Sequence, residues 1–202
     1  MPKQKNSYHH GDLRRALIDA GEAELSENGL AAFSLRRVAA RVGVSHAAPA
    51  HHFGDVSGLI DALAERGFRR LLDSMIAHQE AATDEPYEQL IASGLGYLHF
   101  ARSHPALFRL IFSDHSGAAP SPEVMATAGA AFMHLATNVA AVHGAAPLAH
   151  DGARDEVMAC WTRVHGIAEL ILSGMMDAPD KDDKAANDAM FRSIFEVQFR
   201  TS

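Results

Sequence analysis

The segment SLRRVAARVGVSHAAPAHHF, at residues 34–53, is the part of the chain that most constrains its fold. Two short helices can cross steeply on a turn of three or four residues only if they touch closely and the backbone reverses sharply. Leu35, Val38 and Val42 would form the apolar stripe of the first helix. Gly43 follows where a left-handed conformation ends a helix at least cost. The spacing predicts a helix-turn-helix, and an ordinary helical hairpin is the alternative.

The second helix of this motif is predicted to be unusual. Ser45 could cap it and Phe53 would close its apolar side, which leaves small and polar side chains facing solvent, as suits a DNA major groove. Pro49 cannot donate a backbone hydrogen bond and crowds the preceding turn. We therefore expect a short or late-starting helix, with Pro49 at its first position as one option. The solvent-facing residues are His46, Ala47, Ala48, Ala50 and His51.

Charge is distributed unevenly along the chain. The formal net charge is −7, but residues 1–70 contain ten Lys and Arg against eight Asp and Glu, whereas residues 71–202 contain eight against seventeen. No acidic residue lies between Asn28 and Gly54. One end of the molecule could therefore face phosphate groups while the rest repels them. A chance fluctuation of charge is the competing explanation.

The rest of the chain is predicted to be helical, because β-branched residues are scarce and no sustained alternation of apolar and polar residues marks a strand. Asp12 would cap the first helix and Asp55 the fourth. We expect an all-α protein of about nine helices, with a three-helix helix-turn-helix DNA-binding domain at residues 1–54 and a ligand-binding and dimerisation bundle at residues 55–202. Later helices are predicted at about 86–102, from 103–105 onward, and at about 122–143, 152–176 and 183–199.

Bulk composition is that of a globular protein, with 48% hydrophobic and 21% charged residues. The polar N-terminus shows no signal peptide, and no run approaches the roughly 18 apolar residues of a membrane helix. The single cysteine, Cys160, excludes an internal disulfide and fits a reducing cytoplasm. The sequence predicts a cytoplasmic, nucleoid-associated protein with no membrane partner.

Thirteen histidines raise the question of a metal site. Helical ligand pairs need a spacing of three or four residues, whereas His46, His51 and His52 are five and one residues apart, without a nearby acid or cysteine. We therefore expect no metal and no cofactor. His165 and Glu169 do have the i,i+4 spacing, and an internal hydrogen-bonded pair is favoured there over a ligand or metal site. No nucleotide-binding or catalytic signature occurs, so an enzyme is the runner-up class.

Residues 8–63, YHHGDLRRALIDAGEAELSENGLAAFSLRRVAARVGVSHAAPAHHFGDVSGLIDAL, resemble the DNA-binding domain of the TetR family of transcriptional regulators. The shared features are the first helix, the F-S-L segment, the VA…VGVS turn, the HHF exit and the following helix. WTRVHGIAELILSG, at residues 161–174, resembles a ligand-binding-domain helix of one branch of that family. The resemblance implies an all-α homodimer that binds DNA at one end and a small molecule in a variable domain. Effector binding usually releases DNA by moving the fourth helix.

Two positions depart from the family pattern. Members commonly carry an aromatic residue at the position of Ala50, whose hydroxyl contacts phosphate, and a basic residue at the position of Val56. Both contacts are absent here.

The candidate DNA contacts lie in or beside the motif. Polar and basic groups are expected on phosphates, and the exposed side of the second helix on base edges. Because a histidine gains a proton more readily beside phosphate, DNA affinity is expected to rise as the pH falls from about 7.5 to 6. The candidate DNA-binding residues are Ser34, Arg36, Arg37, Ser45, His46, Ala47, Ala48, His51 and His52.

Bulky apolar residues concentrate at residues 90–135 and 157–176. They are first of all core, but ligand pockets in bundles lie between helices and are mostly apolar with a few polar groups. We therefore expect a cavity for a hydrophobic small molecule. The candidate ligand-binding residues are Tyr97, Phe100, Phe108, Phe112, Phe132, His134, Trp161 and His165.

The last two predicted helices carry apolar stripes that could pair around a two-fold axis, with burial inside one subunit as the alternative. The prediction is therefore a homodimeric, ligand-responsive regulator, with repression favoured, that binds a palindromic double-stranded DNA operator. An enzyme on a bundle and a helical interaction protein without a DNA role are the rival classes. The stripes comprise Val157, Val164, Ile167 and Ile171, then Met190, Phe191, Ile194, Phe195 and Phe199.

Overall fold

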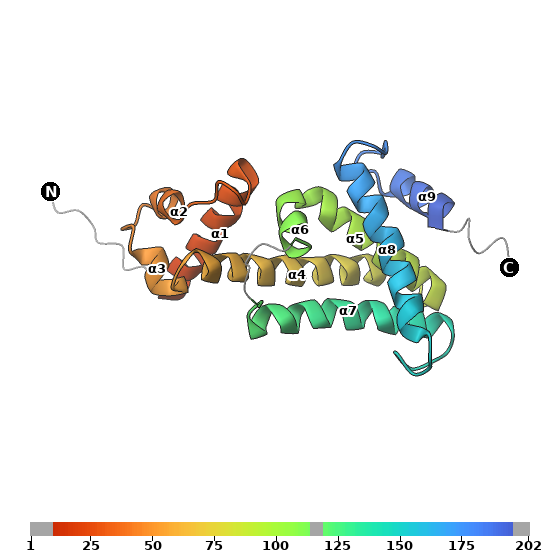
Figure 1. Ribbon diagram of the computed structural model, residues 1–202. Helices are drawn as coiled ribbons and strands as arrows, with labels where there is room; N and C mark the ends of the chain where they lie inside the picture. The colour runs from red at the N-terminus through yellow and green to blue at the C-terminus, as the bar shows by residue number, and fades with distance from the viewer. Residues whose placement is uncertain (1–9, 114–118, 196–202) are drawn as a thin grey trace.

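The computed structural model describes residues 10–113 and 119–195 (Figure 1). Within those residues every regular element is an α-helix, so the predicted all-α fold is confirmed. The helices are α1 (His10–Asn28), α2 (Leu35–Val42), α3 (Ala48–Phe53), α4 (Val56–Glu80), α5 (Pro86–Ser103), α6 (Pro105–Ile111), α7 (Pro122–Val142), α8 (Ala153–Leu172) and α9 (Lys184–Phe195).

The long helix α4 connects the two parts of the molecule. Figure 1 shows α1, α2 and α3 grouped at one end of α4, and α5 to α9 gathered around the rest of its length. Buried side chains form one continuous cluster, from Leu17 and Val38 at the first end to Phe100 and Phe191 in the bundle. The two parts therefore share one helix and one core.

The ends of α2 are determined by Ser34 and Gly43, as predicted. The Ser34 hydroxyl oxygen accepts a hydrogen bond of 3.5 Å from the Arg37 backbone N–H, where helical donors lack intrahelical partners. Gly43 is left-handed, with φ of 74°, and its N–H donates to carbonyl oxygens in the last turn of α2. Asp55 caps α4 as predicted, by accepting from the Gly58 N–H at 3.1 Å.

Helix α3 is six residues long and begins late, as predicted, but its cap differs from the prediction. It begins at Ala48, so Pro49 is its second residue rather than its first. Ala47 is the N-cap and makes no side-chain hydrogen bond, while Ser45 lies in the turn before the helix. Proline is tolerated only in the first turn, where no intrahelical acceptor waits for the missing N–H. The expectation that Ser45 caps this helix is therefore wrong.

Some other helix boundaries differ from the expected ones by a few residues. Helix α1 begins at His10, so Asp12 lies in its first turn, where its charge favours the helix dipole, rather than at the cap. Helix α8 ends at Leu172 instead of about residue 176. The end of α9 expected near residue 199 lies outside the described residues.

Two glycines allow close approach between helices. A Cβ atom added to Gly96 of α5 would lie 2.4 Å from the Ser74 carbonyl oxygen and 2.6 Å from Met75 Cα. The Ser74 hydroxyl donates to the Gly96 carbonyl oxygen at 2.8 Å across the same contact. A Cβ added to Gly67 of α4 would lie 2.6 Å from Ile111 Cγ2. Helices α5 and α6 are thus held against α4 by contacts that leave no room for a methyl group.

Helix α9 is attached to α5 by charge. Arg192 donates from Nη1 to Glu88 at 3.0 Å and from Nε to Asp188 at 2.8 Å. These hydrogen bonds to Glu88 lower the pKa of its carboxyl group and raise the pKa of Arg192. Burial of Phe191 completes the attachment, with 1% of the side chain exposed.

The apolar stripes of α8 and α9 pack largely inside the subunit. Val157, Val164 and Ile167 of α8 are buried, as are Phe191 and Phe195 of α9. The expectation that these residues form a dimer interface is therefore wrong for the buried members, because the bundle already covers them. Phe199 lies outside the described residues. The large apolar side chains that stay exposed near the end of α8 are Leu170, at 44%, and Met175, at 81%.

Helix α7 is long and apolar enough to cross a membrane by length and composition, which the sequence expectation missed. Its most apolar window is 28% buried. Core helices of bundles meet the same test, and α7 packs against α4, α5 and α8, with Ala131, Ala136 and Val139 buried. One such helix does not define a membrane protein.

Candidate DNA interface and ligand cavity

Helices α2 and α3 form the candidate DNA interface at the end of the molecule farthest from α9 (Figure 1). Arg36 is exposed on α2, and Ser34 is half-buried because its hydroxyl caps that helix. Ser45, His46 and Ala47 are exposed in the turn that precedes α3, not on a helix. On α3 itself, His51 is exposed, whereas Ala48 and His52 are half-buried. The structure brings the predicted residues together on one short motif.

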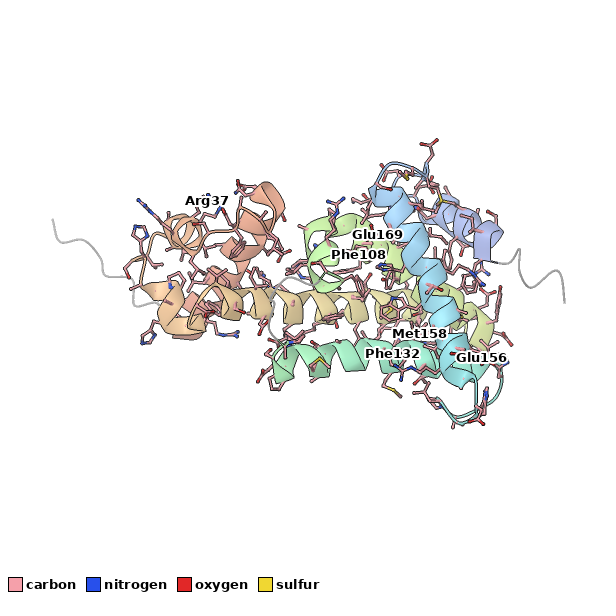
Figure 2. All side chains as sticks on the ribbon, in the orientation of Figure 1. Arg37, Phe108, Phe132, Glu156, Met158 and Glu169 are labelled. Carbon is pink, nitrogen blue, oxygen red and sulfur yellow. The ribbon has the colours of Figure 1, made fainter. Side chains whose placement is uncertain are left out.

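Arg37 differs from the other predicted contacts because its guanidinium is paired within the protein, although 48% of the side chain is exposed. Arg37 is labelled at α2 in Figure 2. Its guanidinium donates to the carboxylate of Glu24 on α1 and to the Ala32 carbonyl oxygen. Glu24 is 0% exposed, and its second oxygen lies 3.5 Å from Arg41 Nε. Arg37 therefore holds α2 against α1, a role that the acid-free sequence between Asn28 and Gly54 did not reveal.

A second ion pair supports the same contact between α1 and α2. Arg41 donates to Glu27 at 3.0 Å, and this hydrogen bond lowers the pKa of Glu27. Glu24 and Glu27 are three residues apart and so share one face of α1. That spacing was the sequence signal that could have predicted which arginines are neutralised.

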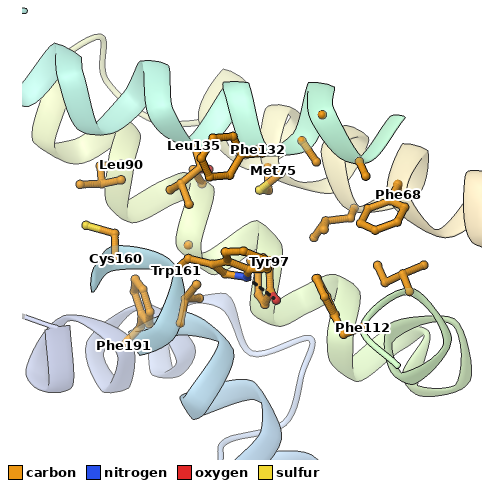
Figure 3. Close-up of a pocket in the computed structure, with 18 of the residues that line it drawn as sticks. Phe68, Met75, Leu90, Tyr97, Phe112, Phe132, Leu135, Cys160, Trp161 and Phe191 are labelled. Atoms are coloured by element: carbon orange, nitrogen blue, oxygen red, sulfur yellow. Dashed lines mark hydrogen bonds between the residues drawn. The ribbon is translucent and has the colours of Figure 1, made fainter. Parts of the chain in front are cut away.

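An apolar cavity of about 380 Å³ lies among α4, α5, α6, α7, α8 and α9 (Figure 3). Four of the eight predicted ligand residues line it: Tyr97, Phe112, Phe132 and Trp161. The lining residues on α4 and α9 were not predicted, and those on α9 were expected in the dimer interface instead. These missed residues include Phe68, Leu71, Met75, Phe191 and Phe195.

The other four predicted ligand residues do not line the cavity. Phe100 and Phe108 are 1% and 0% exposed and belong to the core behind the cavity wall. His165 stacks on Phe108, with ring centroids 5.4 Å apart. His134 is half-buried, its Nε2 atom is buried without a hydrogen-bond partner among the described residues, and burial lowers the pKa of its imidazole.

The polar group of the cavity wall is centred on Tyr97. Its hydroxyl oxygen accepts a hydrogen bond of 3.4 Å from Trp161 Nε1 and lies 2.8 Å from His165 Nδ1. Burial raises the pKa of Tyr97 and lowers the pKa of His165. Both groups are therefore neutral, and the phenol donates a hydrogen bond to Nδ1 when that ring nitrogen carries no proton. This corrects the expected pairing of His165 with Glu169, since His165 pairs with a residue of α5 and Glu169 is exposed.

Among the described residues that line the cavity, none carries a charged side chain. The other polar atoms of the lining come from Ser93, which is 2% exposed, and from Cys160, the pKa of which is raised by burial. A protonated thiol of this kind is a poor nucleophile. In the residues that the structure describes, no group of three His, Cys, Asp or Glu side chains is arranged to hold a metal ion. The lining can accommodate an uncharged, mostly apolar molecule.

Two family models match the chain in succession. The model described as "Bacterial regulatory proteins, tetR family" matches residues 17–63, and the model described as "Tetracyclin repressor-like, C-terminal domain" matches residues 90–194. The second match alone spans half of the chain. A helix-turn-helix module joined to a helical bundle defines the class of helix-turn-helix transcription regulators. The chain belongs to the TetR family of DNA-binding transcriptional regulators.

Solved structures show the same fold over nearly the whole chain. A protein of unknown function from Rhodococcus sp. RHA1 is 32% identical, with a TM-score of 0.76, and the alignment covers 94% of this chain and 98% of that one. A TetR variant from Acinetobacter baumannii AYE, in complex with minocycline, is 22% identical, with a TM-score of 0.54 over 96% of this chain and 99% of that one. The latter likeness concerns the fold alone.

Among curated relatives, the HTH-type transcriptional regulator BetI of Burkholderia thailandensis is 38% identical over 82 residues. The matched region covers 40% of this chain and 42% of that protein. The likeness to BetI is therefore limited to less than half of either protein.

Proposed function

We propose that the protein is a ligand-responsive repressor, which binds a near-palindromic operator as a homodimer and releases it when a small hydrophobic molecule occupies the cavity. The observation that carries this proposal is the position of α4. Phe68, Leu71 and Met75 of α4 line the cavity, while the first turns of the same helix follow α3 directly and pack against α1. A ligand that displaces these side chains would move α4, and with it α3, which precedes α4 directly and packs against it.

The cavity chemistry supports a mostly apolar, uncharged effector with one hydrogen-bonding group. A buried charge without a partner is strongly disfavoured, and the described lining residues offer no counter-ion. A hydroxyl or carbonyl group placed near Tyr97 and Trp161 could share their hydrogen bonds. The volume of about 380 Å³ is toward the small end of the range typical of ligand pockets.

For operator binding, we propose that residues 1–54 act as the DNA-binding domain and residues 55–202 as the effector and dimerisation domain. Arg36, Ser45 and the N-cap Ser34 would contact phosphates, and the turn and exposed side of α3 would approach bases. The exposed Leu170 and Met175 support a dimer contact near the end of α8. A regulator that acts on the chromosome would work in the cytoplasm, at the nucleoid.

The test uses the single tryptophan of the chain, Trp161, because it lines the cavity. Operator sequences would first be selected from random DNA by the purified protein and sequenced. A panel of small molecules would then be screened by Trp161 fluorescence and by release of the selected operator. The control variant is Ala128→Phe, which fills the cavity because Ala128 lines it. Compounds that change both signals in the wild type and neither signal in this variant would support the proposal. Compounds that release DNA equally well from Ala128→Phe would contradict it.

A further inference from the structure

A second cleft, of about 650 Å³, lies between α1, α3 and α4, and no residue of α2 lines it. We name it the basic cleft. It is lined by one acidic residue, Glu65, and by six basic or potentially basic side chains. These are Arg14, Arg15, His51, His52, Arg66 and Arg69.

The arginines at the far end of the basic cleft are already neutralised. Arg66 donates to Asp19 at 2.6 Å and to Glu22 at 3.0 Å, and Arg69 donates to Glu65 at 2.5 Å. Their charges are therefore largely satisfied within the protein.

Arg14 and Arg15 are different. Both are exposed on α1, and neither forms an ion pair with any residue that the structure describes. Residues 1–9, which precede α1, contain no acid in the sequence. The positive charge still available in the basic cleft is thus confined to the end beside α3.

Arg14 is also held in place. Its guanidinium carbon lies 5.3 Å from the centroid of the Phe53 ring, a cation–π distance. Phe53 is the last residue of α3, and His51 and His52 precede it with ring centroids 5.7 Å apart. This contact ties the arginines of α1 to the histidines of α3.

We propose that Arg14 and Arg15, together with His51 and His52, bind the sugar–phosphate backbone that borders the major groove occupied by α3. This inference rests on the proposed operator binding by α2 and α3. It supplies a second set of phosphate contacts in a chain whose Ala50 and Val56 have no group to offer phosphate. Together with Arg36 on α2, these residues place cations on both sides of α3.

The position of the available charge favours DNA over a free anion. A free phosphate would be held best where cations converge around it, but the convergent arginines of the far end already bind carboxylates. The available cations lie at the end beside α3, the helix that would itself enter the groove. A DNA strand that follows the groove edge passes this end of the basic cleft.

The experiment compares the salt dependence of operator binding in matched variants. The slope of log K against log salt concentration is negative, and removal of one phosphate-binding cation should reduce its magnitude by about 0.9 per protomer. Arg15→Gln and Arg14→Gln should each show this decrease, and Arg14→Lys should largely restore the slope. Arg69→Gln is the control, because it removes the same charge from the same cleft but farther from α3. At the helical rise per residue, Arg69 lies roughly 20 Å along α4 from Val56, the first residue of that helix. It should leave the slope unchanged.

Phosphate-ethylation interference gives a second readout. Modified phosphates at the groove edge should block the wild type and lose their effect in Arg15→Gln. An equal decrease of slope in Arg69→Gln and Arg15→Gln would show a general field effect and overturn the inference. A wild-type slope in both Arg14→Gln and Arg15→Gln would also overturn it. The same holds if calorimetry at constant ionic strength shows that the wild type binds pyrophosphate and that Arg15→Gln abolishes this binding without changing DNA binding. Wild-type protein that selects no DNA would overturn the proposed function as well, so the two failures are distinguishable.

Discussion

The hydroxyl group of Tyr97 lies 2.8 Å from Nδ1 of His165 and joins α5 to α8 beside the apolar cavity. Because the same oxygen accepts from Trp161, the group is fully engaged within the protein itself. A ligand that hydrogen-bonds here must therefore exchange with a contact inside the protein. Occupancy would change how α8 is attached to α5.

Tyr97→Phe removes this hydroxyl while it preserves the shape of the cavity. We expect the free energy of unfolding to fall by about 1–2 kcal/mol, since Nδ1 of the half-buried His165 loses its partner. Urea denaturation measures the effect. In a double-mutant cycle with His165→Leu, the second substitution should cost less once the first is present, and strictly additive costs would contradict the hydrogen bond.

Arg37→Ala should impair both stability and DNA binding. Glu24 is fully buried and would lose a charge-assisted hydrogen bond, so we expect a loss of about 2 kcal/mol in the free energy of unfolding. Arg36→Ala, at the neighbouring exposed position, should weaken DNA binding at unchanged stability. Thermal melts and operator titrations on both variants check this. Equal stability of the two variants would show that the Glu24 contact does not hold α2.

We expect His46, which is exposed in the turn before α3, to contact bases. His46→Ala should change the sequences selected from random DNA, whereas Arg36→Ala should weaken binding to all sequences alike. An unchanged selected sequence in His46→Ala would exclude this residue from base contact.

Stability should decrease as the pH falls below the usual histidine range. Burial lowers the pKa values of His99, His104, His134 and His165. The unfolded chain then binds more protons than the folded protein below about pH 6.5, so acidification favours unfolding. Relative to the wild type, His134→Leu should become more stable as the pH drops from about 7 to 5.5. A pH-independent difference in urea denaturation would refute the role of His134.

The contact at Gly96 gives a test of the fold itself. Gly96→Ala would place a methyl group against the Ser74 carbonyl oxygen and should cost about 1–3 kcal/mol in the free energy of unfolding. Gly129→Ala of α7 is the matched control, because no described atom of a neighbouring element lies within 4 Å of its added Cβ. It should be neutral or raise stability by up to about 1 kcal/mol, as alanine favours helix. Similar losses in both would contradict the close packing of α4 and α5.

Local sequence signals predicted most of the helices and the motif at residues 34–53. Ser34, Gly43 and Asp55 determine helix ends through their own side chains or backbone, so their effect is visible without tertiary information. At α3 two local signals compete, and the missing N–H of Pro49 prevails over the capping hydroxyl of Ser45.

The errors arose where distant segments meet. The partner of His165 is Tyr97, 68 residues earlier, and no spacing along α8 reveals it. Arg37 resembled a free cation because its acid lies 13 residues earlier, on another helix. Phe108 and Phe112 are one helical turn apart, yet only Phe112 lines the cavity. The packing of α6 against α4 determines which of these aromatic side chains lines the cavity and which is buried in the core.

The shared helix α4 also limits how regulators of this kind can be recombined. Leu59 and Leu63, beyond the predicted domain boundary, touch the position of Gly21 in α1, where an added Cβ would meet them at 3.5 Å. A chimera cut at residue 54 would strip the DNA-binding module of these side chains and expose its interior. A graft that exchanges operator specificity must therefore include the donor's α4 through Leu63. The junction must also lie before Phe68, so that the recipient keeps the residues that line its own cavity. Only a few residues of one helix satisfy both conditions.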